Sequence, residues 1–135
     1  MKIKIIKNIV LFILVFVFSI ILSHWFGQMY YSSLNITQGI SSFIVSESVN
    51  YYITGFILAL FLFVFLFFTA FGDSTKYWWI GILLIPAIIF ELYFDLEHIY
   101  IPIVIGLIGW VIGFVISKII GNIKPIKSGQ NQKNV

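Results

Sequence analysis

The sequence predicts an all-α, polytopic membrane protein with four transmembrane helices and with both termini on the cytoplasmic side. The composition is too apolar for a soluble domain, four apolar stretches are each long enough to cross a bilayer, and every lysine falls on one side of a four-span arrangement. We expect a single transmembrane domain over residues 1–125 and a polar, disordered cytoplasmic tail over residues 126–135.

The composition sets the class of protein. Of the 135 residues, 61% are hydrophobic and 10% are charged, and the mean hydropathy is +1.08. A soluble domain is about 45–50% apolar and about 25% charged. A chain of this size leaves roughly a third of its unfolded surface in water, so one small core would not hide this much apolar surface. The chain has no cysteine, which excludes disulfides, thiolate metal sites and cysteine nucleophiles.

The four apolar stretches are predicted to be helices. A bilayer core of about 30 Å requires about 20 apolar residues in helical conformation. The predicted spans are residues 9–27, 51–71, 77–93 and 101–120. All four are apolar on every side, which is typical of membrane spans, and none alternates as the strands of a membrane barrel do. Proline suits the first turn of a helix and glycine its end, so Pro102 and Gly121 fit the bounds of the last span.

The lysines predict the orientation. They precede the first span, lie in the second connection, or end and follow the fourth span: Lys2, Lys4, Lys7, Lys76, Lys118, Lys124, Lys127 and Lys133. The positive-inside rule assigns that side to the cytoplasm. The start of the chain resembles a signal peptide, but no small-x-small cleavage site follows, so we expect an uncleaved first span. Ile and Phe are frequent and Ala is scarce, a bias that suggests an AT-rich genome, and we place the protein in a bacterial inner membrane.

The same lysines bear on partners. Their positions favour contacts with anionic lipid headgroups rather than with nucleic acid. We expect no nucleic-acid partner and no cofactor, because the glycines do not lie in a strand–turn–helix context that binds phosphate.

Small residues recur at helical spacing in two of the spans. They are Ser19, Ser23 and Gly27 in the first span, and Gly109, Gly113 and Ser117 in the fourth. Such faces let helix backbones approach each other in lipid. They predict either packing within the chain or an interface with a second copy or another membrane protein. Pro86, inside the third span, predicts a kink because proline removes a helical hydrogen bond.

Glu91 is the one carboxylate inside an apolar span. If the third helix continues beyond it, Asp95 and His98 share its face, and His24 lies at a similar depth in the first span. An ionisable group at this depth is costly unless it is paired, hydrated or protonated. These four residues are candidates for ion coupling or for binding Zn²⁺ or Mn²⁺. The alternative is that Glu91 reaches water or His24 at the outer interface, while Asp95 is an ordinary loop residue.

The sequence favours a non-enzymatic accessory, assembly or interaction subunit whose small-residue faces dock other helices. The alternative is a small oligomeric transporter or channel that couples to protons or cations through Glu91. A membrane enzyme would require Glu91, Asp95, His98 and His24 to converge around one pocket.

Overall fold

In the computed structural model, residues 2–34, 47–94 and 96–123 are described, and all of their regular secondary structure is helical. The helices are α1 (Lys2–Leu34), α2 (Glu47–Phe71), α3 (Lys76–Phe94) and α4 (Tyr100–Ile123), with a short 3₁₀ turn, η1 (Leu96–His98), before α4. Each of the four long helices contains a stretch that is long and apolar enough to cross a membrane. The prediction of four apolar helices is therefore confirmed.

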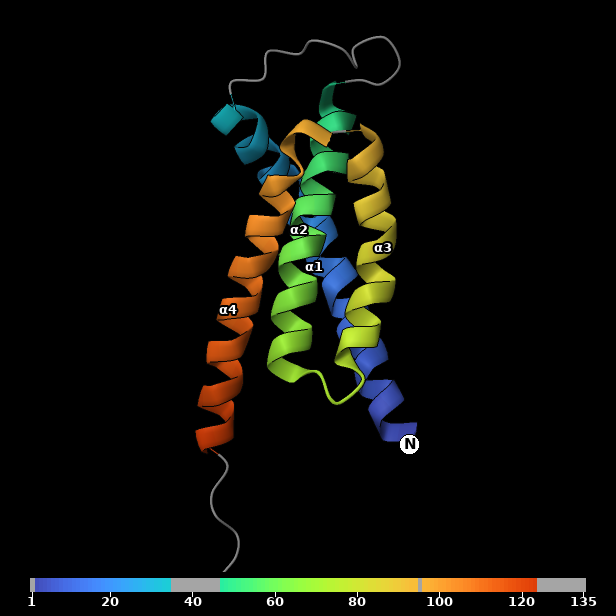
Figure 1. Ribbon diagram of the computed structural model, residues 1–135, viewed down its shortest axis with the longest axis vertical. Coiled ribbons are helices and arrows are strands. Elements are labelled where there is room, and N and C mark those ends of the chain that lie inside the picture. Colours follow the sequence, from blue (N-terminus) through green and yellow to red (C-terminus); the bar gives the residue numbers. More distant parts are fainter. Residues whose placement is uncertain (1, 35–46, 95, 124–135) are drawn as a thin grey trace, which may run out of the picture.

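Helix α1 is longer than its predicted span. Its 33 residues correspond to about 50 Å at 1.5 Å per residue, whereas the hydrocarbon core is about 30 Å thick. The extra turns lie at both ends, because neither the lysines at the start nor the polar residues after Gly27 interrupt helical hydrogen bonding. Helix α1 runs obliquely to the other helices and crosses behind α2 in Figure 1.

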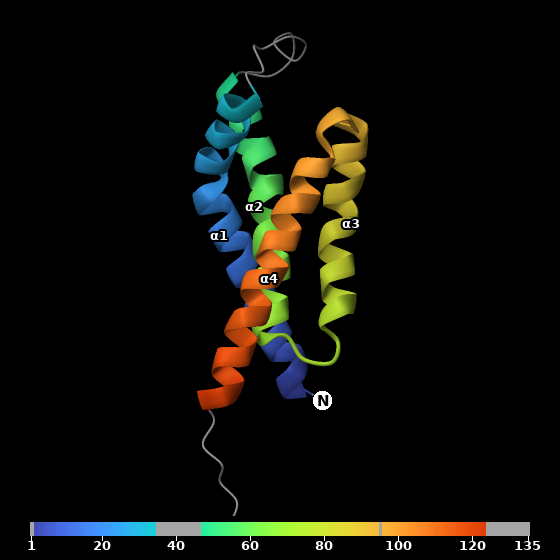
Figure 2. The ribbon, with the colours of Figure 1, turned by 60° about the vertical axis from the view of Figure 1, so that its left-hand side comes forward.

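Helix α2 is the centre of the bundle. Both α1 and α4 pack extensively on α2, and α3 packs on it less closely. Viewed in Figure 2, α4 passes in front of α2, with α1 and α3 on either side. Helix α1 begins and α4 ends at the same end of the bundle, as four successive spans require (Figure 1).

The core lies where α1, α2 and α3 face one another. It is entirely apolar, and α2 supplies its largest share: Leu11, Val15, Ile57, Leu60, Phe61, Val64, Phe68, Ile80, Leu83, Leu84 and Ala87. Large apolar side chains also cover the outside of the bundle. Ile21 on α1 and Leu107 on α4 are 67% and 58% exposed, as expected for a surface that contacts lipid tails.

Candidate functional site

Glu91 lies inside the bundle near the end of α3. It is only 6% exposed, although it is a carboxylate within a span. The core residues Leu84 and Ala87 precede it at helical spacings of seven and four, so Glu91 continues the face of α3 that turns toward the protein. This placement keeps the carboxylate out of direct contact with lipid.

The condition under which Glu91 and His98 would share one helical face is not met. Helix α3 ends at Phe94, and His98 closes the separate turn η1, so helical spacing does not relate His98 to Glu91. Asp95 lies outside the described residues. The His98 ring instead lies 6.1 Å from the ring of Tyr30 on α1 and 6.4 Å from that of Tyr100 on α4. His98 therefore joins the ends of α1 and α4.

His24 lies elsewhere on the surface of α1. Its side chain is exposed, and its ring centroid is 5.0 Å from that of Tyr52 on α2. Among the residues that the structure describes, no three His, Asp or Glu side chains are grouped so that they could hold a metal ion. The convergence that a metal site or an enzyme would need is thus not seen in this part of the chain.

Three of the candidate packing residues lie between α1 and α2. Ser19 and Ser23 are buried, and Ser23 Oγ donates a hydrogen bond of 2.7 Å to the Ile20 carbonyl. A Cβ atom on Gly27 would overlap the Tyr51 carbonyl, and one on Gly55 would overlap the Ser23 carbonyl and lie 2.5 Å from the Gly27 nitrogen. The two backbones therefore touch where Gly27 and Gly55 face each other.

The glycines of α4 contact α2 in the same way. A Cβ atom on Gly109 would overlap the Leu62 carbonyl, and one on Gly113 would lie 2.6 Å from the Leu66 oxygen. The small-residue face then runs past α2, because Ser117 is exposed and Gly121 has open space where a Cβ would stand. Gly27, Gly109 and Gly113 thus lie at close backbone contacts within the chain, whereas no described residue covers Ser117 and Gly121 near the end of α4.

Asn8 forms a polar link that the sequence analysis missed. This buried side chain donates through Nδ2 to Thr75 Oγ1 at 3.0 Å and to Asp73 Oδ1 at 3.4 Å. Asp73 Oδ1 also accepts from the Thr75 N–H at 3.3 Å and from Thr75 Oγ1 at 3.0 Å. The link ties the start of α1 to the connection between α2 and α3. The sequence signals for this link are Asn8, directly before the apolar run of the first span, and the capping residues Asp73 and Thr75 before the third span.

The same link lowers the pKa of Asp73. Partial burial of the carboxylate acts to raise its pKa, but the hydrogen bonds from Thr75 and Asn8, together with the positive charge of Lys7, outweigh it. The pKa of Asp73 therefore lies below its ordinary value of 3.8.

Acidification is expected to weaken this link. Because the folded-state pKa is below the unfolded-state pKa, Asp73 contributes its full stabilisation above about pH 4 and loses it as the pH falls through the folded-state value. The measurement is the difference in Tm between the wild type and Asp73→Asn in detergent, at several pH values. We expect the difference to shrink below about pH 4. A constant difference would show that the charge of Asp73 does not matter.

An apolar groove lies between α1 and α3, with α2 as its floor. Its volume is about 480 Å³, and Pro86 is among its lining residues. On α1 it is lined by Phe12 and Phe16, whose rings pack against each other at a tilt, with centroids 4.8 Å apart. Phe12 also lies 6.4 Å from Trp79 of α3. The predicted kink at Pro86 stays a prediction, but the residue lies inside α3 and its side chain is exposed.

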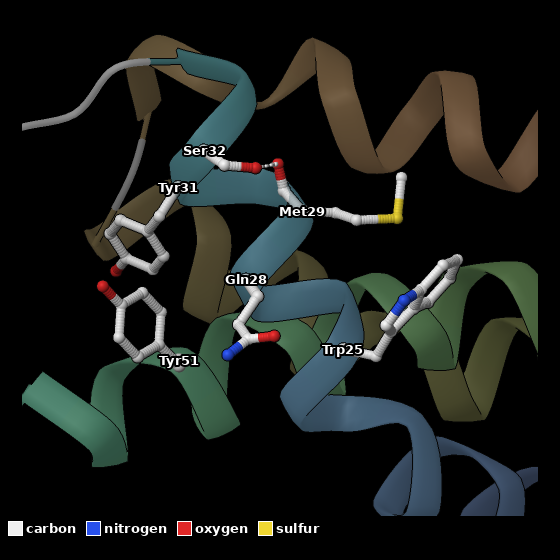
Figure 3. Close-up of a pocket in the computed structure, with 6 residues that line it drawn as sticks. All are labelled: Trp25, Gln28, Met29, Tyr31, Ser32 and Tyr51. Carbon is white, nitrogen blue, oxygen red and sulfur yellow. Dashed lines mark hydrogen bonds between the residues drawn. The ribbon is translucent and has the colours of Figure 1, made fainter.

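A second cavity, of about 600 Å³, lies at the far end of α1 from Asn8. It is lined by Trp25, Gln28, Met29, Tyr31, Ser32 and Tyr51. Figure 3 shows Tyr31 and Tyr51 side by side, with Gln28 between Tyr51 and Trp25. The Tyr31 hydroxyl lies 3.5 Å from Thr54 Oγ1, and Ser32 Oγ donates to the Met29 carbonyl at 3.1 Å. Amphipathic rings of this kind are typical of a membrane interface.

Comparisons with protein-family models, with curated proteins and with solved structures give no match. The class of protein therefore follows from the chain itself. Its four apolar helices, their lipid-compatible surface and the apolar core cluster define a small multi-pass membrane protein.

Proposed function

We propose that this protein is a non-enzymatic accessory or assembly subunit, and that the end of α4 docks a helix of another membrane protein or of a second copy. The observation that carries the proposal is the uncovered continuation of the α4 small-residue face. Gly113, Ser117 and Gly121 follow one another at steps of four on one side of the helix, and only the first is covered by α2.

The physical argument is that small residues are useful in lipid only where another backbone comes close. Lipid tails are as apolar as leucine, so helices associate through close packing rather than through the hydrophobic effect. Gly109 and Gly113 already hold α2 in this way. The same chemistry at Ser117 and Gly121 suits a helix supplied from outside the described chain.

The apolar core also supports a packing role. Phe, Leu, Ile and Val side chains make up most of the core cluster that α1, α2 and α3 share. Close apolar packing of this kind holds helices in fixed positions.

The proposal is tested by changing the uncovered face alone. The variant Ser117→Leu with Gly121→Leu is expected to abolish cross-linking to the partner and to speed migration of the native complex. Bulky side chains would keep a docking backbone away. Ile119→Leu, at a 53% exposed position on the same helix, is the control and should leave the complex unchanged. Identical complexes from both variants would refute docking at this face.

We further propose a bacterial inner-membrane location with both termini in the cytoplasm. The support is the placement of all eight lysines on one side, where they would contact anionic headgroups. Reporter fusions after Lys127 and within residues 74–76 are expected to report the cytoplasm. Fusions within residues 32–42 are expected to report the outside. A periplasmic signal from the fusion after Lys127 would overturn this orientation.

A second candidate function is supported by Glu91. A carboxylate that is 6% exposed within a membrane span is the arrangement that proton- or cation-coupled transporters use. In this alternative the protein is a small oligomeric transporter or channel, and Glu91 takes up and releases the coupled ion.

A further inference from the structure

We propose that the groove between α1 and α3 binds one acyl chain of an anionic phospholipid, whose phosphate is held by Lys7 and Lys76. This inference goes beyond the docking role of α4 and does not depend on it. It joins three observations: the apolar lining of the groove, its position along the membrane-spanning helices, and the two lysines beside the Asn8–Thr75 hydrogen bond.

The two sides of the groove are linked near the start of α3. Asn8 on α1 donates a hydrogen bond of 3.0 Å to Thr75, which directly precedes α3, and the Phe12 ring lies 6.4 Å from the Trp79 ring of α3. Figure 2 shows α1 and α3 on either side of α2 and α4. The side chains of α2 that form the floor, such as Ile57 and Leu60, are buried apolar residues of the core.

The contents of the groove must be apolar. Its lining side chains on α1, α2 and α3 are all apolar, and they all belong to stretches that can cross a membrane. Its volume of about 480 Å³ lies within the range of about 300–1,000 Å³ that small-molecule sites occupy. At this depth of a bilayer the surrounding material is lipid acyl chain.

The groove lies within reach of a lipid whose headgroup is at Lys76. Lys76 begins α3, and the lining residues of α3 run from Ile82 to Phe90. At 1.5 Å per residue these residues lie about 9–21 Å along the helix from Lys76, around the middle of a hydrocarbon core of about 30 Å. An acyl chain that extends through its own leaflet of about 15 Å would enter the first part of the groove.

The charges next to this link select the headgroup. Lys7 precedes Asn8 and Lys76 follows Thr75, so the two lysines flank the Asn8–Thr75 hydrogen bond. Lys7 is exposed, and the Lys76 ammonium lies 5.3 Å from the centroid of the Tyr77 ring. The Asp73 carboxylate accepts hydrogen bonds from Asn8 and Thr75 through one of its oxygens, and the positive charge of Lys7 also acts on this carboxylate. Basic residues between membrane helices recognise anionic lipid phosphates.

The test uses Trp79 as a reporter, because its ring lies next to the groove residue Phe12. In a protein carrying Trp25→Phe, Trp78→Phe and Trp110→Phe, Trp79 is the remaining tryptophan, and bromine on an acyl chain quenches its fluorescence at close range. The protein is reconstituted in vesicles of phosphatidylcholine and phosphatidylglycerol, with one or the other brominated. We expect brominated phosphatidylglycerol to compete for the site about fivefold or more better than brominated phosphatidylcholine.

Matched variants in the same background separate headgroup from chain. Lys7→Gln with Lys76→Gln should bring the ratio of the two lipids close to one. Lys118→Gln should leave it unchanged, although Lys118 also lies over an aromatic ring, that of Phe114. Ile82→Phe fills the groove and should reduce quenching by both lipids, whereas Ile85→Phe, on the same helix but outside the groove lining, should not.

Three results would overturn the proposal. The first is equal quenching by the two lipids in the protein with all its lysines. The second is equal behaviour of Ile82→Phe and Ile85→Phe. The third is Trp79 emission that is shielded from both lipids and becomes accessible on dilution of protein in lipid, which would assign the groove to a second copy of the chain.

Discussion

Replacing Gly55 by alanine is expected to unfold or loosen the α1–α2 pair, although alanine adds a single methyl group. The new Cβ would overlap the Ser23 carbonyl and approach the Gly27 nitrogen to 2.5 Å. Both atoms belong to the backbone of a helix, so they cannot turn aside as the end of a side chain can. We expect a loss of about 3 kcal/mol or more, the upper end of the cost of overpacking.

Gly81→Ala is the matched control for this prediction. Gly81 also lies inside a helix, but a Cβ there would have no neighbour within 4 Å among the described residues. Alanine favours helix over glycine by about 1 kcal/mol, so this variant should be as stable as the wild type or more stable. Thermal unfolding in detergent, followed by circular dichroism, measures both. If the two variants lost the same stability, close backbone packing at Gly55 would not be the cause.

Glu91→Gln is expected to separate the two proposed functions. The amide keeps the size and polarity of the side chain, so the protein should still insert and fold. If the protein is an accessory subunit, its complex with the partner should be unchanged. If Glu91 couples to an ion, flux into vesicles should fall at least tenfold, because an amide cannot take up and release a proton.

The control for this variant is Glu97→Gln in the turn η1. Glu97 is exposed, so its loss tests the effect of removing a negative charge near the same end of the bundle. A folded Glu91→Gln protein with full flux would end the ion-coupling alternative. A loss of flux in both variants would assign the effect to surface charge.

The four helices were predictable because each contains an uninterrupted apolar stretch that is long enough to cross a membrane. The bounds were less predictable. Helix α1 continues to Leu34 through Tyr30 and Ser32, which are polar enough to suggest a loop but do not break a helix. The membrane orientation remains a prediction, because it depends on lysines and on a bilayer that helix packing alone does not define.

The candidate site was predictable only in part. Spacing placed Gly27 and Gly113 on faces where the structure has close backbone contacts, since a helix repeats about every 3.6 residues. Helical spacing does not place His98 beside Glu91, because α3 ends at Phe94 and His98 belongs to the separate turn η1. The link from Asn8 to Thr75 joins residues 67 positions apart, and such a pairing depends on how three helices cross rather than on any local pattern.

The central place of α2 has a consequence for biogenesis. Helices α1 and α2 leave the ribosome first, and the contact between Gly27 and Gly55 lies wholly between these two helices. A helical hairpin can therefore form in the bilayer before the rest of the chain is made, as N-terminal parts of larger chains commonly do. The side of α2 that faces Gly109 and Gly113 stays open to lipid until α4 is inserted. During that interval the surface of α2 around Leu62 and Leu66 is exposed to lipid in the nascent chain. Helix α4, the last to be synthesised, then covers this surface.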